Sequence, residues 1–199
     1  MSAPRDWPAA DTVLRAHAQA ARAPAPDALA HAASTLGDPW AMVALALLGA
    51  VALARRGARR IALTVATVPL AAVLAFNAIK LTVRRVRPPG AVALGELRFS
   101  FPSGHATVVA ATSAVVAWAL VREGIVSRRV ASVTAVTWAA LVGASRVWLD
   151  AHWASDVLAG WALGGAIAAL GTWLGGATLS SRHVVAKGRP EGARVVQSD

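Results

Sequence analysis

Cysteine is absent from this 199-residue sequence and lysine is nearly so, and both scarcities narrow the chemistry available to the chain. Without cysteine the chain forms no disulfides and builds no thiolate metal site. Lysine occurs only at positions 80 and 187, while the other eighteen of the twenty basic residues are arginine. This makes Lys80 conspicuous. We also expect no signal peptide, because the first 35 residues carry scattered charges and prolines instead of a basic start and an apolar core.

Acidic residues are few, so the chain carries a net charge of +10. A large positive charge can indicate a nucleic-acid partner. Here the arginines stand in short clusters between apolar runs, and no basic stripe with interleaved aromatic residues occurs. The sequence therefore predicts a membrane environment and no nucleic-acid partner.

Long apolar runs dominate the composition, since 56% of the residues are hydrophobic and only 15% are charged. A helix that crosses a bilayer needs about 20 apolar residues, with about 17 as the lower limit. Three of the runs here are a little shorter, but flanking arginines can snorkel and a bilayer can thin locally. The sequence thus predicts an all-α, polytopic transmembrane helical bundle of about five spans in the cell membrane. The charge-free runs are Trp40–Ala54, Ile61–Ile79, Ala106–Val121, Val130–Ser145 and Val157–Ser181.

Three parts are expected along the chain. Residues 1–38 form an N-terminal tail with a helical segment on the membrane surface, residues 39–181 the transmembrane domain, and residues 182–199 a disordered basic tail in the cytoplasm. In the first part, Asp11–Ala23 predicts a polar, alanine-rich helix that prolines end, and Asp27 is the predicted N-cap of a second short helix. A loosely ordered tail is the alternative for this part.

Basic loops indicate the orientation in the membrane. The loop Arg55–Arg60 holds four arginines in six residues, and short basic loops stay in the cytoplasm. Alternating the spans from this loop places the C-terminus in the cytoplasm as well. It also brings Lys80, residues 99–105 and residues 145–156 to the outer side. We therefore expect one extracytoplasmic site built from three polar clusters.

The densest of these clusters lies between Ser145 and Asp156. His152 and Asp156 are four residues apart, which puts both side chains on one face of a helix. A carboxylate beside an imidazole fixes its tautomer, as a nucleophile or a general base requires. Arg146 adds a planar cationic fork that suits phosphate oxygens. The alternative for the whole stretch is a pair of interfacial salt bridges at a helix end.

The second cluster is Phe101–His105, directly before an apolar helix. Ser103 can cap that helix, and Gly104 permits close approach of the backbone. Free backbone N–H groups and the helix dipole make such a helix start an anion site, over which His105 would stand. The alternative is a plain helix start with a histidine whose hydrogen bonds are satisfied.

The third cluster holds Lys80 and Arg87, seven residues or about two helical turns apart, so that both side chains can point the same way. Alone, it would more often be a solvated or lipid-headgroup face. Together the three clusters supply cations, an N–H cradle and two histidines, one with a carboxylate partner. This set suits phosphoryl transfer without a metal, because positioning and charge stabilisation provide most of that catalysis. We predict no metal and no cofactor, since so many cations would repel a divalent ion.

These residues resemble a known family. The patterns Lys80-x6-Arg87-Pro88, Pro102-Ser103-Gly104-His105 and Ser145-Arg146-x5-His152-x3-Asp156 are similar, in order and spacing, to the three signatures of the type-2 phosphatidic acid phosphatase superfamily. That superfamily includes membrane lipid phosphatases, polyprenyl diphosphate phosphatases, glucose-6-phosphatases and soluble vanadium haloperoxidases. Its membrane members commonly have six spans, so the first is either missing here or replaced by the surface segment before Pro39.

The resemblance implies a role for each site residue. His152 would be the nucleophile that forms a phosphohistidine, with Asp156 orienting it. His105 would protonate the leaving oxygen and later activate water. The phosphate oxygens would be held by Lys80, Arg87, Ser103, Gly104 and Arg146.

The expected function is that of a metal-independent phosphatase, which removes a terminal phosphate from a membrane lipid phosphate or diphosphate of the phosphatidic acid or polyprenyl diphosphate type. One alternative is a phosphotransferase that passes the phosphoryl group from phosphohistidine to an alcohol, and another is a non-catalytic lipid-phosphate binder or flippase. Gly160, Gly164 and Ala168 recur every four residues in the last span. Small residues at this spacing favour close packing inside the bundle, with a homodimer face as the alternative.

Overall fold

Helices form every named element of the structure. The computed structural model describes residues 9–91 and 99–187, and the all-α prediction is confirmed there. The elements in these ranges are α1 (Ala9–Ala20), α2 (Pro24–Leu36), α3 (Pro39–Arg55), α4 (Arg59–Val83), α5 (Gly104–Arg122), α6 (Arg128–Trp148) and α7 (Ala154–Lys187).

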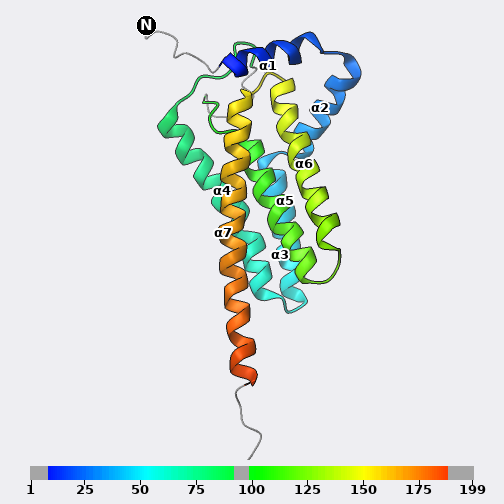
Figure 1. Cartoon of the computed structure of the whole chain (residues 1–199), viewed down its shortest axis with the longest axis vertical. Coiled ribbons are helices and arrows are strands. Elements are labelled where there is room, and N and C mark those ends of the chain that lie inside the picture. The colour runs from blue at the N-terminus through cyan, green and yellow to red at the C-terminus, as the bar shows by residue number, and fades with distance from the viewer. Residues whose placement is uncertain (1–8, 92–98, 188–199) are drawn as a thin grey trace, which may run out of the picture.

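The helices α3 to α7 run alternately up and down and form an antiparallel bundle around α5 (Figure 1). Helix α5 is central because it packs against α3, α4, α6 and α7. Its residues Ala106, Val108, Val109, Ala111 and Val115 are completely buried. Small and branched side chains of this kind let neighbouring helices approach closely, so the core of the bundle lies along α5.

Within the described part of the chain, four helices are long and apolar enough to cross a membrane by themselves, namely α4, α5, α6 and α7. Helix α3 has 17 residues and passes the same test only together with α2, from which it is bent by 49°. The predicted count of about five spans is therefore reached when this bent pair is taken as one span. The break falls at Gly37 and Asp38, where the Asp38 carboxylate accepts hydrogen bonds from the backbone of Trp40 (2.9 Å) and Ala41 (3.1 Å) and so caps α3.

The outer surface of the bundle is apolar. Leu48 of α3 is 69% exposed, and Leu63 and Leu74 of α4 are 65% and 72% exposed. Large leucines on the outside of a helical bundle are unfavourable in water but suit contact with lipid tails. The exposed side chains thus agree with the apolar runs in indicating a bilayer around α3 to α7.

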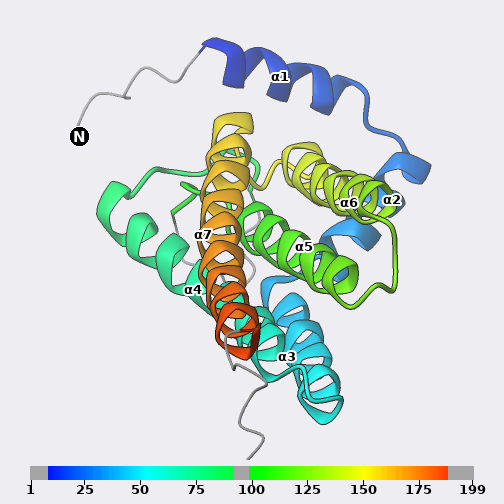
Figure 2. The same cartoon turned by 60° about the horizontal axis from the view of Figure 1, so that its bottom comes forward.

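The N-terminal segment forms two helices. Helix α1 crosses the end of the bundle, and α2 packs along α6 (Figures 1 and 2). The predicted N-cap at Asp27 is wrong, because α2 begins at Pro24 and its cap is Ala23. Proline is tolerated in the first helical turn, where its missing N–H has no partner in any case. The prolines therefore start α2, whereas α1 has already ended at Ala20.

Helix α7 crosses α5 through glycines. A Cβ atom built on Gly160 would lie 2.8 Å from the carbonyl oxygen of Ser103, and one on Gly164 would collide with the carbonyl oxygen of Thr107. This is the packing inside the bundle that the glycine spacing favours. Helix α7 continues to Lys187, six residues beyond residue 181, where the transmembrane domain was expected to end. The rest of the predicted tail, residues 188–199, lies outside the described residues.

Candidate active site

Polar side chains are buried together at one end of this apolar bundle. The end of α4, the start of α5 and the turn between α6 and α7 meet there, beneath α1 (Figure 1). Burying a polar group costs free energy unless it is hydrogen-bonded or paired, so a cluster of such groups indicates a site. The buried polar residues at this end include Asp11, Ser34, Lys80, Arg87, Ser100, Ser103, His105, Ser145, Asp150, His152 and Asp156.

His152 and Asp156 form the centre of this cluster. The Nδ1 atom of His152 lies 3.6 Å from Oδ2 of Asp156, and both side chains are completely buried. The same carboxylate oxygen accepts a hydrogen bond from the backbone N–H of Trp153 at 3.0 Å, which fixes its direction. The other ring nitrogen, Nε2, lies 3.4 Å from Nη1 of Arg87. Nδ1 thus faces a carboxylate while Nε2 faces a cation that could hold an anion.

His152 is held in its neutral form. Burial lowers the pKa of His152 from 6.5 to about 4, although the hydrogen bond with Asp156 opposes this shift. The positive charges of Arg87, Arg146 and Lys80 lower it further. At neutral pH the imidazole therefore keeps a lone pair, as a nucleophile requires.

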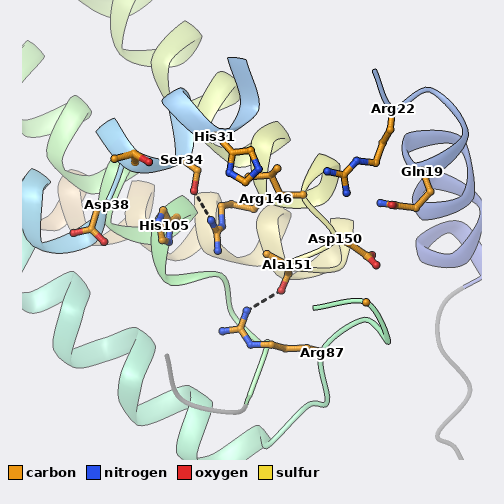
Figure 3. A pocket seen from close by; sticks show the side chains of 13 residues that line it. Gln19, Arg22, His31, Ser34, Asp38, Arg87, His105, Arg146, Asp150 and Ala151 are labelled. Carbon is orange, nitrogen blue, oxygen red and sulfur yellow. Dashed lines mark hydrogen bonds between the residues drawn. The ribbon is translucent and has the colours of Figure 1, made fainter. Parts of the chain in front are cut away.

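A cavity of about 690 Å³ opens beside this centre, and Figure 3 shows the side chains around it. Three separate segments contribute to its lining. Arg87 comes from the linker after α4, His105 from α5 and Arg146 from α6. Arg87 donates from Nη1 to the carbonyl oxygen of Ala151 at 2.8 Å, and Arg146 donates to the hydroxyl of Ser34. The remaining lining residues are Gln19, Arg22, His31, Thr35, Asp38, Gly90, Leu149 and Asp150.

The start of α5 is tied to the same centre. Ser103 caps α5 by accepting from the backbone N–H of Ala106 at 3.5 Å, as its position predicts. Its own N–H donates to the backbone oxygen of Asp156 at 3.0 Å. The helix that carries His105 is therefore fixed directly to the first turn of α7, which begins two residues after His152.

Lys80 and Gly104 both lie against the aromatic ring of Phe76. The Nζ atom of Lys80 lies 5.3 Å from the centroid of the Phe76 ring, a cation–π distance. A Cβ atom on Gly104 would lie 3.0 Å from the same ring. Glycine at this position leaves room for Phe76, and through it for Lys80. With these two, all eight residues predicted for the site lie at one end of the bundle.

The structure adds residues that the sequence did not single out. Arg85 donates from Nη1 to Oδ1 of Asp156 at 2.6 Å, so the central carboxylate has an arginine partner. Its position inside the Lys80–Arg87 run was a signal that could have found it. Asp150, to which the sequence assigned no chemistry, forms a bidentate ion pair with Arg15 of α1 at 2.6 and 2.7 Å.

Known proteins resemble this chain in sequence and in fold. A phosphatidylglycerophosphatase B of Bacillus subtilis (strain 168) is 40% identical over 89 residues, which are 43% of this chain and 44% of that protein. The match thus spans less than half the length of this curated relative. A crystal structure described as the first transmembrane PAP2 type phosphatidylglycerolphosphate phosphatase from Bacillus subtilis superposes with a TM-score of 0.72 and 28% identity, over 83% of this chain and 84% of that one.

The family follows from a third match, to a family model. The PAP2 superfamily matches residues 60–178, which is more than half of the chain and includes all three polar clusters. The resemblance drawn from the sequence motifs is thereby confirmed. The apolar helices and the solved transmembrane relative agree with a multi-pass membrane protein. The chain belongs to the PAP2 superfamily.

Proposed function

We propose that this chain is a membrane lipid phosphatase that removes a terminal phosphate through a phosphohistidine intermediate on His152. The observation that carries the proposal is the orientation of the buried imidazole. Its Nδ1 faces Asp156, while its Nε2 lies 3.4 Å from Nη1 of Arg87, beside the cavity. A neutral imidazole aligned by a carboxylate and aimed at a cationic anion site is suited to attack on phosphorus.

The reaction has two balanced steps. In the first, Nε2 of His152 attacks the phosphorus atom, and the bond between phosphorus and the lipid oxygen breaks while His105 gives a proton to that oxygen. In the second, water attacks the phosphohistidine and its proton passes to His105. Inorganic phosphate leaves, and His152 is neutral again. Asp156 stabilises the imidazolium character that develops on His152 in between.

Cations supply the charge stabilisation. The positive charges of Arg87, Arg146 and Lys80 act on His152 and would act in the same way on a phosphoryl group bound at Nε2. In metal-dependent phosphoryl transfer, divalent ions neutralise this charge. Here guanidinium and ammonium groups would take that task, so activity is expected in excess EDTA.

A lipid is the substrate class that the surroundings favour. A mostly apolar groove of about 500 Å³ runs between α3, α5 and α6, and its lining includes Leu36 and Met42. Leu36 directly follows Ser34 and Thr35, which line the polar cavity. A phosphate in the cavity and a hydrocarbon tail in the groove would therefore be bound by neighbouring residues of one chain.

The similar proteins suggest which lipids to test first. Both matched relatives carry names that specify a phosphatidylglycerophosphate phosphatase. We therefore rank phosphatidylglycerophosphate first, phosphatidic acid second and a polyprenyl diphosphate third. The site lies at the opposite end of the bundle from Arg55–Arg60, and this basic loop favours the cytoplasm. The proposed location of the site is therefore the extracytoplasmic side, with α7 ending in the cytoplasm.

The first experiment measures phosphate release by detergent-purified protein in excess EDTA, across these three lipids, with His152→Ala alongside. Loss of a nucleophile lowers turnover by about 10⁴-fold or more, so the variant is expected to release no measurable phosphate. Unchanged release by His152→Ala would remove the nucleophile assignment. If wild type releases phosphate only after addition of an acceptor alcohol, the protein is a phosphotransferase. Binding of lipid phosphate without any release would instead indicate a non-catalytic binder.

A further inference from the structure

A buried carboxylate connects the N-terminal helix to the proposed active site. Asp11 belongs to α1 but is only 2% exposed. Its Oδ1 accepts from the backbone N–H of Ser155 at 2.9 Å, and its Oδ2 accepts from the hydroxyl of Ser155 at 2.5 Å. Burial raises the pKa of Asp11, but the hydrogen bonds from Ser155 and Arg85 outweigh it and lower the pKa overall. Asp11 is therefore an ionised group directly beside the start of α7.

Arg85 lies between two carboxylates. Its Nη2 donates to Oδ2 of Asp11 at 2.7 Å, and its Nη1 donates to Oδ1 of Asp156 at 2.6 Å. The Arg85 side chain is 12% exposed, and its guanidinium lies 5.7 Å from the ring centroid of Trp153. Its backbone oxygen accepts from the N–H of Ser100, which is completely buried. The guanidinium is thus fixed in place and its positive charge is divided between two acids.

We propose that Asp11 is a positioning residue for the proposed catalytic pair, acting through Arg85 on Asp156; this inference rests on the proposed function. An arginine paired with Asp156 alone would draw its negative charge away from His152. Asp11 takes up part of that positive charge and keeps the guanidinium plane in one orientation. Asp156 then remains able to stabilise the imidazolium that forms during attack on phosphorus.

The competing explanation is that Asp11 merely anchors α1 on the bundle. The structure offers a matched control, because Arg15 on the same helix forms a second tie, to Asp150. Arg15→Gln removes a charge-assisted contact from α1 without touching Arg85 or Asp156. Equal losses of activity in Arg15→Gln and Asp11→Asn would reduce Asp11 to an anchor and overturn the proposal.

The kinetic test is a double-mutant cycle between Asp11 and Arg85 in the full chain. Asp11→Asn keeps the side-chain shape and is expected to lower kcat by about tenfold, as loss of an outer partner of a site histidine does, with KM within twofold of wild type. Asp11→Glu is expected to restore most of kcat. In an Arg85→Gln background, Asp11→Asn should cost no further activity, because its route to Asp156 is gone. An undiminished cost in that background would contradict the proposal.

A second readout does not depend on turnover. Asp156 is the group whose hydrogen bond raises the pKa of His152. Asp11→Asn should weaken that hydrogen bond and lower the pKa of His152, whereas Arg85→Gln should raise it. NMR titration of labelled histidine in detergent follows both changes. The other charged groups acting on His152 are the cations Lys80, Arg87 and Arg146, which both variants leave in place.

These outcomes separate two kinds of failure. If wild type releases no phosphate from any lipid, the proposed function fails, and the opposite shifts of the His152 pKa still test the link from Asp11. If wild type releases phosphate but Asp11→Asn matches it in kcat and in the His152 titration, the positioning role fails alone. Monodisperse elution and an unchanged melting temperature of Asp11→Asn show that the variant tested is folded.

Discussion

The two ends of the bundle are built from different interactions, although one set of helices forms both. At the end beneath α1, buried polar groups from α1, the linker before α5 and the start of α7 are joined by ion pairs such as Arg85 with Asp11 and with Asp156. At the opposite end, α3 and α4 are joined by a short turn in which Arg56 is exposed and Gly57 has a φ of +87°. Gly124 has a φ of +69° in the turn between α5 and α6.

The difference between the two ends shows where polar side chains determine the local structure. At the end opposite α1, the positive φ values of Gly57 and Gly124 favour glycine, and a Cβ atom added at either residue would meet nothing within 4 Å. Backbone conformation therefore decides that end, where Arg56 and Arg129 are exposed. At the end beneath α1, the side chains of Asp11, Arg85 and Asp156 decide the arrangement. A charge substitution should therefore be costly at one end and tolerated at the other.

Arginine substitutions at the two ends of α6 provide the largest expected contrast. Arg146→Ala removes a cation beside the cavity and is expected to lower kcat/KM by about 10²- to 10³-fold. This is the loss of rate that follows removal of one hydrogen-bond donor to a transition-state anion. Arg129→Ala removes an exposed arginine from the first turn of the same helix and should stay within twofold of wild type. Phosphate release measures both variants. A similar loss in each would mean that net charge, and not the local site, is what matters.

Much of the fold was predictable because its signals are local. The charge-free runs from Trp40 to Ser181 coincide with α3 to α7, since an apolar helix in a bilayer requires little beyond its own sequence. The convergence of Lys80, His105 and His152 was likewise predictable, because alternating spans bring every second loop to the same side. Short motif spacings and the topology were sufficient for both.

The rest depended on contacts between residues far apart in the sequence. Asp11 and Arg85 are 74 residues apart, and the polar, alanine-rich sequence of α1 does not specify which face it turns to the bundle. Arg15 and Asp150 are 135 residues apart. Arg146 meets Ser34 because α2 packs along α6, which the sequence did not indicate. Local propensity carries no information on such pairings. These long-range contacts around the site could therefore not be predicted from the sequence.

Neighbouring glycines in α7 sharpen the comparison between packed and open positions. A Cβ atom on Gly160 would lie 2.8 Å from the Ser103 carbonyl oxygen and 2.9 Å from the Cβ of Ala106, whereas Gly165 has nothing within 4 Å. Gly160→Ala is expected to destabilise the protein by about 1–3 kcal/mol, because two helix backbones must separate. Gly165→Ala should be neutral or stabilising by up to about 1 kcal/mol through helix propensity.

Thermal unfolding in detergent measures both glycine variants. Because Ser103 is bonded to the backbone of Asp156, Gly160→Ala should also lower phosphate release in the protein that remains folded. Equal melting temperatures for the two variants would contradict the close α5–α7 crossing.

The smallest expected effect is the response of the site to mild acid, and it tests whether the buried end really excludes water. Burial and the surrounding cations lower the pKa of His152 from 6.5 to about 4, so the neutral nucleophile persists until the pH falls towards 4. Between pH 7 and pH 5.5, kcat/KM should therefore change by less than about twofold, after correction for the substrate phosphate, whose second pKa is about 6, and for the ionisation of His105, which the histidine NMR titration follows in parallel. A histidine that titrates at 6.5 would lose about tenfold over the same range. A corrected profile that falls with a midpoint near 6.5 would mean that water and protons reach His152 freely, and that this end of the bundle is as open as the other.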